Sequence, residues 1–364
     1  MNLYKERQKR VFSLIAENKV DSFLVTDLVN IRYLCGFTGS NGYLFFFDNK
    51  VYFYTDFRYA LQSEREVFCD KIFIIKKNFY LSPPKELLKV KRLGIEKENL
   101  SLDNYEKLLN YFKKKKKKIK LLPLPNVIRE LRAIKDEEEI SLIKKAASLT
   151  DEVFNKVLNE IKEGVKERDL ALFIEGEFKK NGEIAFPVIV ASGENSALPH
   201  ARASEKEIRF GEAIVIDIGL KYNGYCADLT RTVFLGKISD EFKKIYQIVY
   251  DAQKKAIDFL SFSINEGKKM KAKAVDLRAR SYIKERGYGD FFGHSLGHGV
   301  GLEVHEKPWI SFLSKDQLKP NMVFTIEPGI YLPNKGGVRI EDLVLLREKE
   351  VILLSQSEKN LIVL

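Results

Sequence analysis

The segment AIVIDIGLKYNGYCADLTRTVFLG (residues 213–236) contains two β-branched, apolar runs on either side of an Asn-Gly pair at 223–224. An Asn-Gly pair between such runs is the strongest short signal for a β-hairpin. If the pair forms the loop, Asp217 faces Thr230, and Asp217 and Asp228 lie on one face as diagonal neighbours. Two converging carboxylates repel each other unless a cation lies between them. A bulge would change this register. Two surface aspartates are the alternative, which the buried-type run around Asp217 argues against.

Histidine is rare in the chain, and three of its four copies fall in GHSLGHGVGLEVHE (residues 293–306). These three are His294, His298 and His305, and the fourth, His200, lies in SALPHA. Histidine titrates near neutral pH and is the commonest neutral metal ligand. Core or capping histidines are the alternative, but histidine is not a preferred core residue. The cluster therefore indicates a chemical site, and the glycines beside His298 would allow close backbone approach to a ligand and substrate.

Two glutamates follow strand-like apolar residues in similar surroundings: Glu327 in VFTIEPGIYLP and Glu341 in GGVRIEDLVLL. Each alone is compatible with an exposed or salt-bridged residue. Together with the two aspartates and the histidines they form an oxygen-rich set, which suits Mn, Mg or Co rather than a sulfur-ligated structural zinc. Four carboxylates carry too much negative charge for one divalent ion. They suit two ions about 3.5–4 Å apart that share a bridging water.

The composition is that of an ordinary globular protein, with 364 residues, 45% hydrophobic and 31% charged. Three cysteines at unpaired spacings argue against a disulfide framework and for a reducing compartment, so we expect a cytoplasmic protein. No apolar run reaches the ~18 residues of a membrane span, and the charged N-terminus does not resemble a signal sequence. The net charge is +11, but its densest part, Lys113–Lys118, is typical of a solvated helix end or loop. No nucleic-acid-binding motif accompanies it, so we expect no nucleic-acid partner.

The chain divides near residue 125. Residues 1–125 alternate strand-like and helix-like segments, which predicts an α/β domain. Two prolines in LLPLPN (residues 121–126) cannot lie inside a helix or a central strand, and we take residues 126–135 as a linker. Asp136 then begins a long amphipathic helix whose acidic first turn complements the helix dipole. A second domain is expected over residues 136–364.

Several of these segments resemble the signatures of a known family. DIGLKYNGYCADLTRT, HSLGHGVGLEVHE, TIEPGIY and GGVRIED resemble those of the pita-bread metallopeptidases, which include methionine aminopeptidase, Xaa-Pro aminopeptidase and prolidase. NIRYLCGFTGSNGYLFFF and YTDFRYALQSERE are similar to the creatinase-type domain of the proline-specific members. The resemblance covers the whole chain. It implies an α/β (α+β) fold, with a creatinase-type N-terminal α/β domain followed by a pita-bread catalytic domain.

The resemblance also implies which residues bind metal. The five ligands would be Asp217, Asp228, His298, Glu327 and Glu341. Asp228 and Glu341 would bridge two divalent ions, Asp217 would hold one, and His298 and Glu327 the other. Manganese is the expected metal, with cobalt or zinc as alternatives.

Further roles follow from the same resemblance. His200 and His305 match residues that contact the substrate or stabilise the tetrahedral intermediate, and His294 would line the pocket. Arg339 matches a residue that orients the substrate and the carboxylates, and Glu327 would also carry a proton to the leaving nitrogen. Two residues match supporting positions beside the ligands, namely Thr230 and Tyr331.

Within the family, SGENSALPHA is most similar to Xaa-Pro aminopeptidases and prolidases. We therefore expect an Xaa-Pro aminopeptidase that hydrolyses the bond between an N-terminal residue and a following proline. The alternative is a prolidase, which accepts only Xaa-Pro dipeptides. We also expect a homodimer in which the N-terminal domain limits access to the cleft. Metal-free pita-bread binding proteins and creatinase-like hydrolases are remote alternatives, because all five ligands are present.

Overall fold

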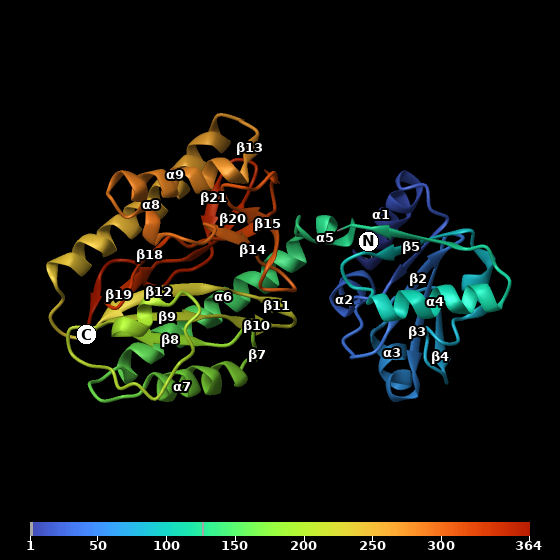
Figure 1. Ribbon diagram of the computed structural model, residues 1–364, viewed down its shortest axis with the longest axis horizontal. Coiled ribbons are helices and arrows are strands. Elements are labelled where there is room, and N and C mark those ends of the chain that lie inside the picture. The colour runs from blue at the N-terminus through green and yellow to red at the C-terminus, as the bar shows by residue number, and fades with distance from the viewer. Residues whose placement is uncertain (1–2, 126) are drawn as a thin grey trace. The chain divides into compact units, whose positions relative to one another are not determined.

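The computed structural model describes residues 3–125 and 127–364 (Figure 1). The chain forms two compact units, an N-terminal unit that ends at Arg132 and a C-terminal unit that begins at Ala133. The three cysteines are free thiols, as their odd number and spacing predict. Within the described ranges, no helix is both long and apolar enough to span a membrane.

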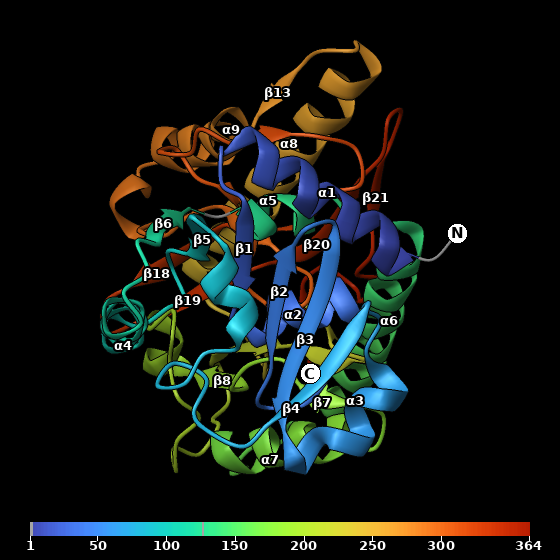
Figure 2. The same cartoon turned by 90° about the vertical axis from the view of Figure 1, so that its right-hand side faces the viewer.

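The N-terminal unit is built on a six-stranded sheet with the order β4-β3-β2-β1-β5-β6 (Figure 2). Its strands are β1 (Ser22–Val25), β2 (Tyr43–Phe47), β3 (Lys50–Asp56), β4 (Lys71–Ile75), β5 (Arg92–Glu96) and β6 (Lys120–Leu124). Its helices are α1 (Leu3–Glu17), α2 (Leu28–Cys35), α3 (Ala60–Glu66), α4 (Leu102–Lys114) and α5 (Val127–Arg132). β2 runs antiparallel to β1 and β3, and the other neighbouring strands are parallel.

Alternation along the strands gives this sheet two apolar faces. Phe46 of β2 contacts Phe12 of α1, with ring centroids 5.3 Å apart. The preceding residue, Phe45, belongs to a core with Leu108 and Phe112 of α4. Helices therefore pack on both faces, which explains why the strand segments are almost continuously apolar.

Helix α5 (Val127–Arg132) lies within residues 126–135, the segment that the sequence analysis takes as a linker. Its Ile128 and Arg132 side chains are buried, and Arg132 Nη1 donates a hydrogen bond of 2.8 Å to Asn30 Oδ1 in α2. This segment is therefore helical and packs within the N-terminal unit. The lysines at 113–118 lie at the end of α4 and in the turn after it, with exposed side chains, which confirms the interpretation of a solvated helix end.

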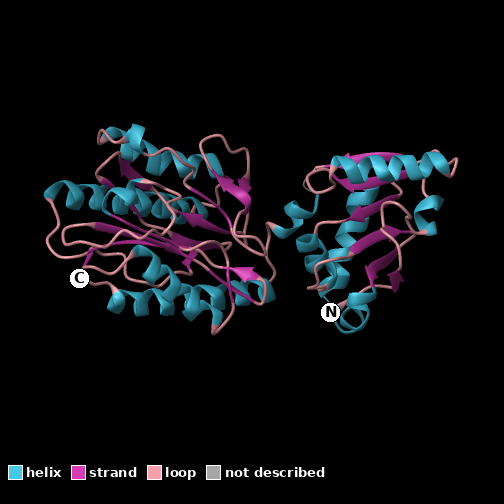
Figure 3. Cartoon of the chain, turned by 60° about the horizontal axis from the view of Figure 1, so that its bottom comes forward, coloured by secondary structure: helices cyan, strands magenta, loops and turns pink. Residues whose placement is uncertain are grey.

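The C-terminal unit places one pair of helices on each side of its strands, α6 and α7 on one side and α8 and α9 on the other (Figures 1 and 3). The helices are α6 (Glu137–Val157), α7 (Glu167–Lys179), α8 (Asp240–Asn265) and α9 (Ala272–Glu285). One sheet has the order β22-β12-β9-β8 and another β15-β14-β17-β20-β21, with smaller sheets β11-β10-β7, β13-β16 and β18-β19.

The strands of these sheets are short. They are β7 (Glu183–Ile184), β8 (Ile189–Ser192), β9 (Ala213–Ile218), β10 (Leu220–Tyr222), β11 (Tyr225–Cys226), β12 (Leu229–Phe234), β13 (Met270–Lys271), β14 (Gly297–Gly299), β15 (Glu306–Ile310), β16 (Gln317–Leu318), β17 (Val323–Ile326), β18 (Gly329–Leu332), β19 (Gly336–Arg339), β20 (Asp342–Leu346), β21 (Val351–Leu353) and β22 (Ile362–Val363).

Helix α6 begins where the sequence predicts. The Asp136 side chain accepts a hydrogen bond of 3.0 Å from Glu139 N, and Glu139 Oε2 accepts one of 3.1 Å from Asp136 N. This reciprocal pair is a capping box, which satisfies two backbone donors at the helix start. The capping box marks the start of α6, the first helix of the C-terminal unit after the boundary at Ala133.

The predicted hairpin is present with the predicted register. Residues 223 and 224 have positive φ angles of 46° and 87°, as a tight two-residue hairpin turn requires. β9 and β12 continue the register, with Thr230 opposite Asp217. Asp217 and Asp228 therefore reach the same side of the hairpin, where they line a common cavity.

Candidate metal centre

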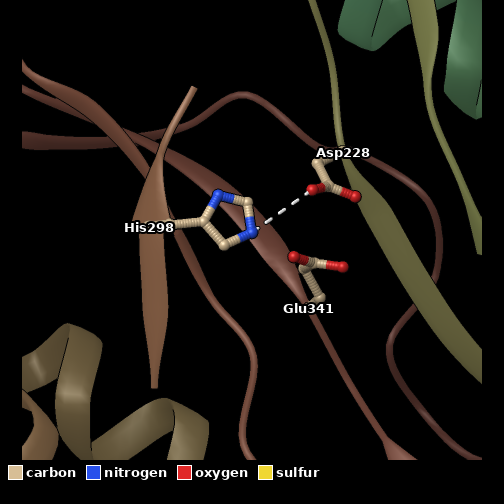
Figure 4. Close-up of side chains that lie close together, drawn as sticks. All are labelled: Asp228, His298 and Glu341. Carbon is tan, nitrogen blue, oxygen red and sulfur yellow. Dashed lines mark ion pairs between the residues drawn. The ribbon is translucent and has the colours of Figure 1, made fainter. Parts of the chain in front are cut away.

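Three of the predicted ligands meet at one point (Figure 4). Asp228 precedes β12, His298 lies in the middle of β14, and Glu341 lies between β19 and β20. Each offers one ligand atom, and these atoms lie within 4.8 Å of one another. The distance between His298 Nε2 and Asp228 Oδ2 is 3.6 Å. Three separate segments thus bring one nitrogen and two carboxylate groups to the spacing that a metal ion needs.

The other two predicted ligands extend this cluster. Glu327 Oε1 lies 3.4 Å from His298 Nε2, and Asp217 lies on β9 opposite Thr230. All five side chains line one cavity of about 760 Å³. The fold therefore brings together all five residues that the family resemblance implies as ligands.

In the protein without cations, these carboxyl groups disfavour one another's ionisation. Burial and the charge of Glu341 raise the pKa of Asp228 well above its ordinary value, and the same two causes raise the pKa of Glu327. Burial and Asp217 raise the pKa of Glu341 to about 8. Among the described residues, Asp217 Oδ1 and Asp228 Oδ1 are buried without a hydrogen-bond partner. Clustered, buried carboxyl oxygens that lack donors fit divalent cations.

Arg339 connects the ligands on one side of the cavity. Its Nη2 donates a hydrogen bond of 2.6 Å to Asp217 Oδ2, and its Nε donates one of 3.1 Å to Thr230 Oγ1. Thr230 Oγ1 in turn donates to Glu341 Oε2 at 2.7 Å. Arg339 Nη1 donates to the Tyr331 hydroxyl at 2.8 Å. Thr230 and Tyr331, which the sequence predicts as supporting residues, both belong to the network that holds Asp217 and Glu341.

Sequence reasoning does not identify Thr325, although this residue holds two of the ligands. Its Oγ1 accepts a hydrogen bond of 3.1 Å from His298 N and donates one of 3.4 Å to Glu327 Oε1. Thr325 is the one polar residue of β17, and it precedes Glu327 by two positions. A polar residue in an otherwise apolar strand, at the spacing of a shared strand face, is the signal that points to it.

The glycines on either side of His298 are required by strand packing. A Cβ atom on Gly297 would overlap the backbone carbonyl of Thr325 in β17, and one on Gly299 would overlap that of Lys307 in β15. The neighbouring strands therefore approach β14 too closely for any side chain at these positions. The expected close approach exists, but it is made by the protein's own backbone rather than by a ligand or substrate.

The four histidines differ in burial. His298 is buried, and burial lowers its pKa to about 3, which favours the neutral form that binds metal. His294 Nε2 lies 3.0 Å from the Tyr331 hydroxyl, and burial lowers the pKa of His294 to about 4. His200 and His305 are exposed in the wall of the same cavity. His298 is thus buried and His200 and His305 are exposed, while the division into one ligand and two residues that face substrate stays a prediction.

Much of the remaining cavity wall is apolar. Helix α7 contributes Leu172, the segment before β8 contributes Phe186, and β15 contributes Trp309. Trp309 is the only tryptophan of the chain, is 43% exposed, and pairs with His298 across β14 and β15. A cavity of this size with apolar walls and a polar cluster suits a small organic ligand.

Two family models match the chain. The model of metallopeptidase family M24 matches residues 141–348, and that of the creatinase/prolidase N-terminal domain matches residues 7–134. The chain belongs to metallopeptidase family M24. This result confirms the family, the two-part fold and the metallopeptidase class expected from the sequence motifs. The M24 family and the carboxylate–histidine cluster together imply divalent metal ions as cofactors.

The similarity to other M24 proteins covers nearly the whole chain. The Xaa-Pro dipeptidase of Pyrococcus furiosus is 40% identical over 362 residues, which cover 98% of this chain and 100% of that protein. The solved structure of an Xaa-Pro dipeptidase from Bacillus anthracis matches with a TM-score of 0.92 and 36% identity, covering 99% of this chain and 100% of that one. The X-Pro aminopeptidase from Thermotoga maritima matches with a TM-score of 0.85 and 38% identity, covering 95% and 98% of the two chains.

Proposed function

We propose that this M24 metallopeptidase is a prolidase, which hydrolyses Xaa-Pro dipeptides. The observation that carries the proposal is the cluster of predicted ligands in a cavity of about 760 Å³. The similar protein from P. furiosus, which matches over its full length, is an Xaa-Pro dipeptidase. The sequence motifs alone favour an Xaa-Pro aminopeptidase. The similar proteins support the alternative, the dipeptidase, better than that expectation.

The cofactor of this proposal is a pair of divalent ions. The residues that would hold it are Asp217, Asp228, His298, Glu327 and Glu341. When bound, two divalent ions lower the pKa of a shared water and polarise the substrate carbonyl. Manganese is the expected metal, with cobalt or zinc as alternatives, because carboxylate-rich sites suit such ions. The homodimer and the cytoplasmic location expected from the sequence stay predictions.

The other polar residues of the cavity would bind substrate and move protons. His200 and His305 would donate hydrogen bonds to the carbonyl oxygen as it becomes negatively charged, since both rings are exposed in the wall. The Glu327 carboxyl would accept a proton from the nucleophile and pass it to the leaving nitrogen of proline. Arg339 and His294 hold Tyr331 through its hydroxyl.

Prolyl substrates explain the apolar part of the wall. In an Xaa-Pro bond the proline nitrogen has no N–H and the ring fixes φ. The proline residue of the substrate therefore offers no backbone donor to an acceptor of the protein. Apolar contact with the ring is one source of binding energy that does not need such a donor. Phe186 and Trp309 supply aromatic surface for that contact.

An Xaa-Pro aminopeptidase is the second candidate. The T. maritima protein of that name has the same fold at a TM-score of 0.85 and 38% identity. The two activities differ in whether the substrate continues beyond proline. A metal-free binding protein or a creatinase-like hydrolase is disfavoured, because all five predicted ligands are present and line one cavity.

The test compares protein that has been stripped by a chelator with the same protein reloaded with Mn²⁺. The substrates are Ala-Pro and Ala-Pro-Ala, with Ala-Ala as the control peptide. We expect no turnover after chelation, recovery with Mn²⁺, and a higher kcat/KM for Ala-Pro than for Ala-Pro-Ala. Equal or faster cleavage of the tripeptide would favour the aminopeptidase, and failure to cleave either prolyl peptide would refute both candidates.

A further inference from the structure

The cavity wall contains three arginines and no lysine among the described residues that line it. These are Arg168, Arg202 and Arg339. Arg339 is fully engaged, because its three nitrogens donate to Asp217, Thr230 and the Tyr331 hydroxyl. Arg168 Nη1 forms an ion pair of 2.6 Å with Glu205. These two guanidinium groups already have protein partners.

Arg202 differs from both. Its side chain is exposed, and it forms no hydrogen bond or ion pair with any residue in the described part of the chain. The cavity also contains Glu175 of α7, which does not lie within ion-pair distance of Arg202. Arg231 is no competitor, because it is buried and bonded to Asp342 at 2.7 Å. Arg202 is therefore the cation of this cavity that is available to a ligand.

The backbone on both sides of Arg202 is anchored. On one side, the Pro199 carbonyl accepts a hydrogen bond of 3.1 Å from Arg339 Nη1. On the other side, Ser204 N and Oγ donate to Glu167 Oε2 at 3.1 and 2.6 Å, and Glu167 is completely buried at the start of α7. The segment between these anchors carries both His200 and Arg202. These anchors fix the backbone from which the Arg202 side chain extends, which lowers the cost of ordering the segment when a ligand binds.

The charges of the cavity determine what Arg202 can recognise. The carboxyl groups of Asp217, Asp228, Glu327 and Glu341 line the cavity, and the two divalent ions that they would hold act at the scissile carbonyl, so a second anionic group of the substrate needs a different cation. An Xaa-Pro dipeptide differs from a longer peptide in having a free carboxylate on its second residue. That carboxylate needs a cation on the opposite side of the scissile bond from the first residue. Arginine offers a planar fork of donors that fits a carboxylate.

We propose that Arg202 binds the α-carboxylate of the dipeptide and thereby selects dipeptides over longer peptides. This inference rests on the proposed function, because it names the group that distinguishes a prolidase from an aminopeptidase. It adds a specificity residue two positions after His200. Arg202 is a binding residue and takes no part in bond cleavage.

The experiment measures kcat and KM of the Mn²⁺-loaded, full-length protein on Ala-Pro, Ala-Pro-amide and Ala-Pro-Ala. The variants are Arg202→Met and Arg202→Lys. The controls are Arg168→Met, which removes a paired cation from the same wall, and Arg209→Met, which removes an exposed cation outside the cavity. Metal content and Tm are measured for every variant, so that loss of the fold or of the ions is recognised.

We expect the ratio of kcat/KM for Ala-Pro to that for Ala-Pro-amide to fall about 10- to 100-fold in Arg202→Met, mainly through KM, because charge-assisted hydrogen bonds are lost. Arg202→Lys should retain part of the ratio, since the ammonium is a single point charge. Both control variants should keep the ratio of the unmodified protein.

Three outcomes would overturn the inference. They are an unchanged ratio in Arg202→Met, an equal loss on dipeptide and amide, and a larger change in Arg168→Met. If Arg202→Met is too slow to assay, titration with L-proline followed by the fluorescence of Trp309 decides instead, and unweakened binding contradicts the proposal. Failure of the unmodified, metal-loaded protein to cleave any of the three substrates would instead refute the proposed function.

Discussion

Arg339 and Asp217 form a partly buried ion pair in which Nη2 donates to Oδ2 at 2.6 Å. The other oxygen of this carboxylate, Oδ1, has no hydrogen-bond partner among the described residues. One oxygen of Asp217 is thus fixed by the protein while the other remains available to a cation. The arginine therefore sets the direction from which Asp217 can coordinate.

We predict that Arg339→Lys lowers kcat/KM about 10- to 100-fold, the range usual for residues that orient metal ligands. A lysine cannot donate to Asp217, Thr230 and Tyr331 at once, because it lacks the planar fork of arginine. Metal content should fall together with activity. Activity and metal stoichiometry measured on the same preparation test this, and Arg209→Lys is the matched control. Normal activity with both ions bound would show that the Arg339 network is dispensable.

Three of the four histidines should fail in two different ways when replaced by alanine. His298→Ala should lose both metal and activity, because it removes the buried ligand of β14. His200→Ala and His305→Ala should keep their metal, while turnover falls about 10²–10³-fold as for other lost transition-state donors. Metal analysis beside kcat for each variant separates the two classes. Loss of metal from His305→Ala as complete as from His298→Ala would contradict the assignment.

The metal-free protein should become less stable as the pH rises above about 6.5. In the unfolded chain, carboxyl groups titrate near pH 4, whereas burial raises the pKa values of Asp228 and Glu327 and, with Asp217, that of Glu341 to about 8. The protonated forms contribute full stability below the unfolded pKa. That contribution is lost as the pH rises through the folded values. The buried His294 and His298, whose pKa values are lowered to about 4 and 3, oppose this loss only up to the unfolded histidine pKa near 6.5. The Tm of chelated protein should therefore fall between about pH 6.5 and 9.

Added Mn²⁺ should oppose this trend, because metal binding requires the deprotonated carboxylates and stabilises the folded state. Thermal melts of chelated and Mn²⁺-loaded protein across this pH range provide the measurement. In Glu341→Gln the fall of the metal-free Tm should be shallower, since one titrating group is removed. A metal-free Tm that rises steadily from pH 5 to 9 would disprove the predicted coupling of the three carboxyl groups.

Local sequence patterns predict those parts of the fold that depend on neighbours in the chain. The Asn-Gly pair gives the correct hairpin register because turn geometry and strand alternation are local properties, and Asp136 marks the start of α6 for the same reason. The convergence of His298, Glu327 and Glu341 with that hairpin does not follow from local patterns. It is implied by the family resemblance, and the fold then places all of them in one cavity.

The residues that sequence reasoning misses act over long separations through ordinary polar groups. Thr325 reaches His298 in the neighbouring strand, and Asp276 of α9 accepts a hydrogen bond from Leu296 N near the histidine cluster. Threonine and aspartate are common in strands and helices without such roles. Only the packing of the sheets shows which of them meets a ligand-bearing segment. The same limit applies to Glu167, whose sequence surroundings suggest no more than the acidic first turn of a helix.

Glu167 should control activity without touching metal or substrate. Its buried carboxylate accepts hydrogen bonds from Ser192 N at 2.7 Å and from Ser204 Oγ at 2.6 Å, and also from Asn195 Nδ2. These donors belong to the two ends of the loop that carries His200. In Glu167→Gln the amide nitrogen cannot accept, so at least one buried donor loses its partner, at a cost of about 1–3 kcal/mol in unfolding free energy. We expect a lower Tm, unchanged metal content and a lower kcat.

A double-mutant cycle separates positioning from general destabilisation, because coupled residues give non-additive effects. If Glu167 acts by placing His200, then Glu167→Gln should reduce kcat about tenfold in the unmodified protein and far less when His200 is already alanine. Glu205→Gln is the control, because Glu205 lies on the same loop but pairs with Arg168 at the exposed surface. Fully additive losses would mean that Glu167 only stabilises the fold and does not act through His200. The cycle thus tests whether the chemistry of the cavity depends on a carboxylate that is buried beside the loop and never meets the substrate.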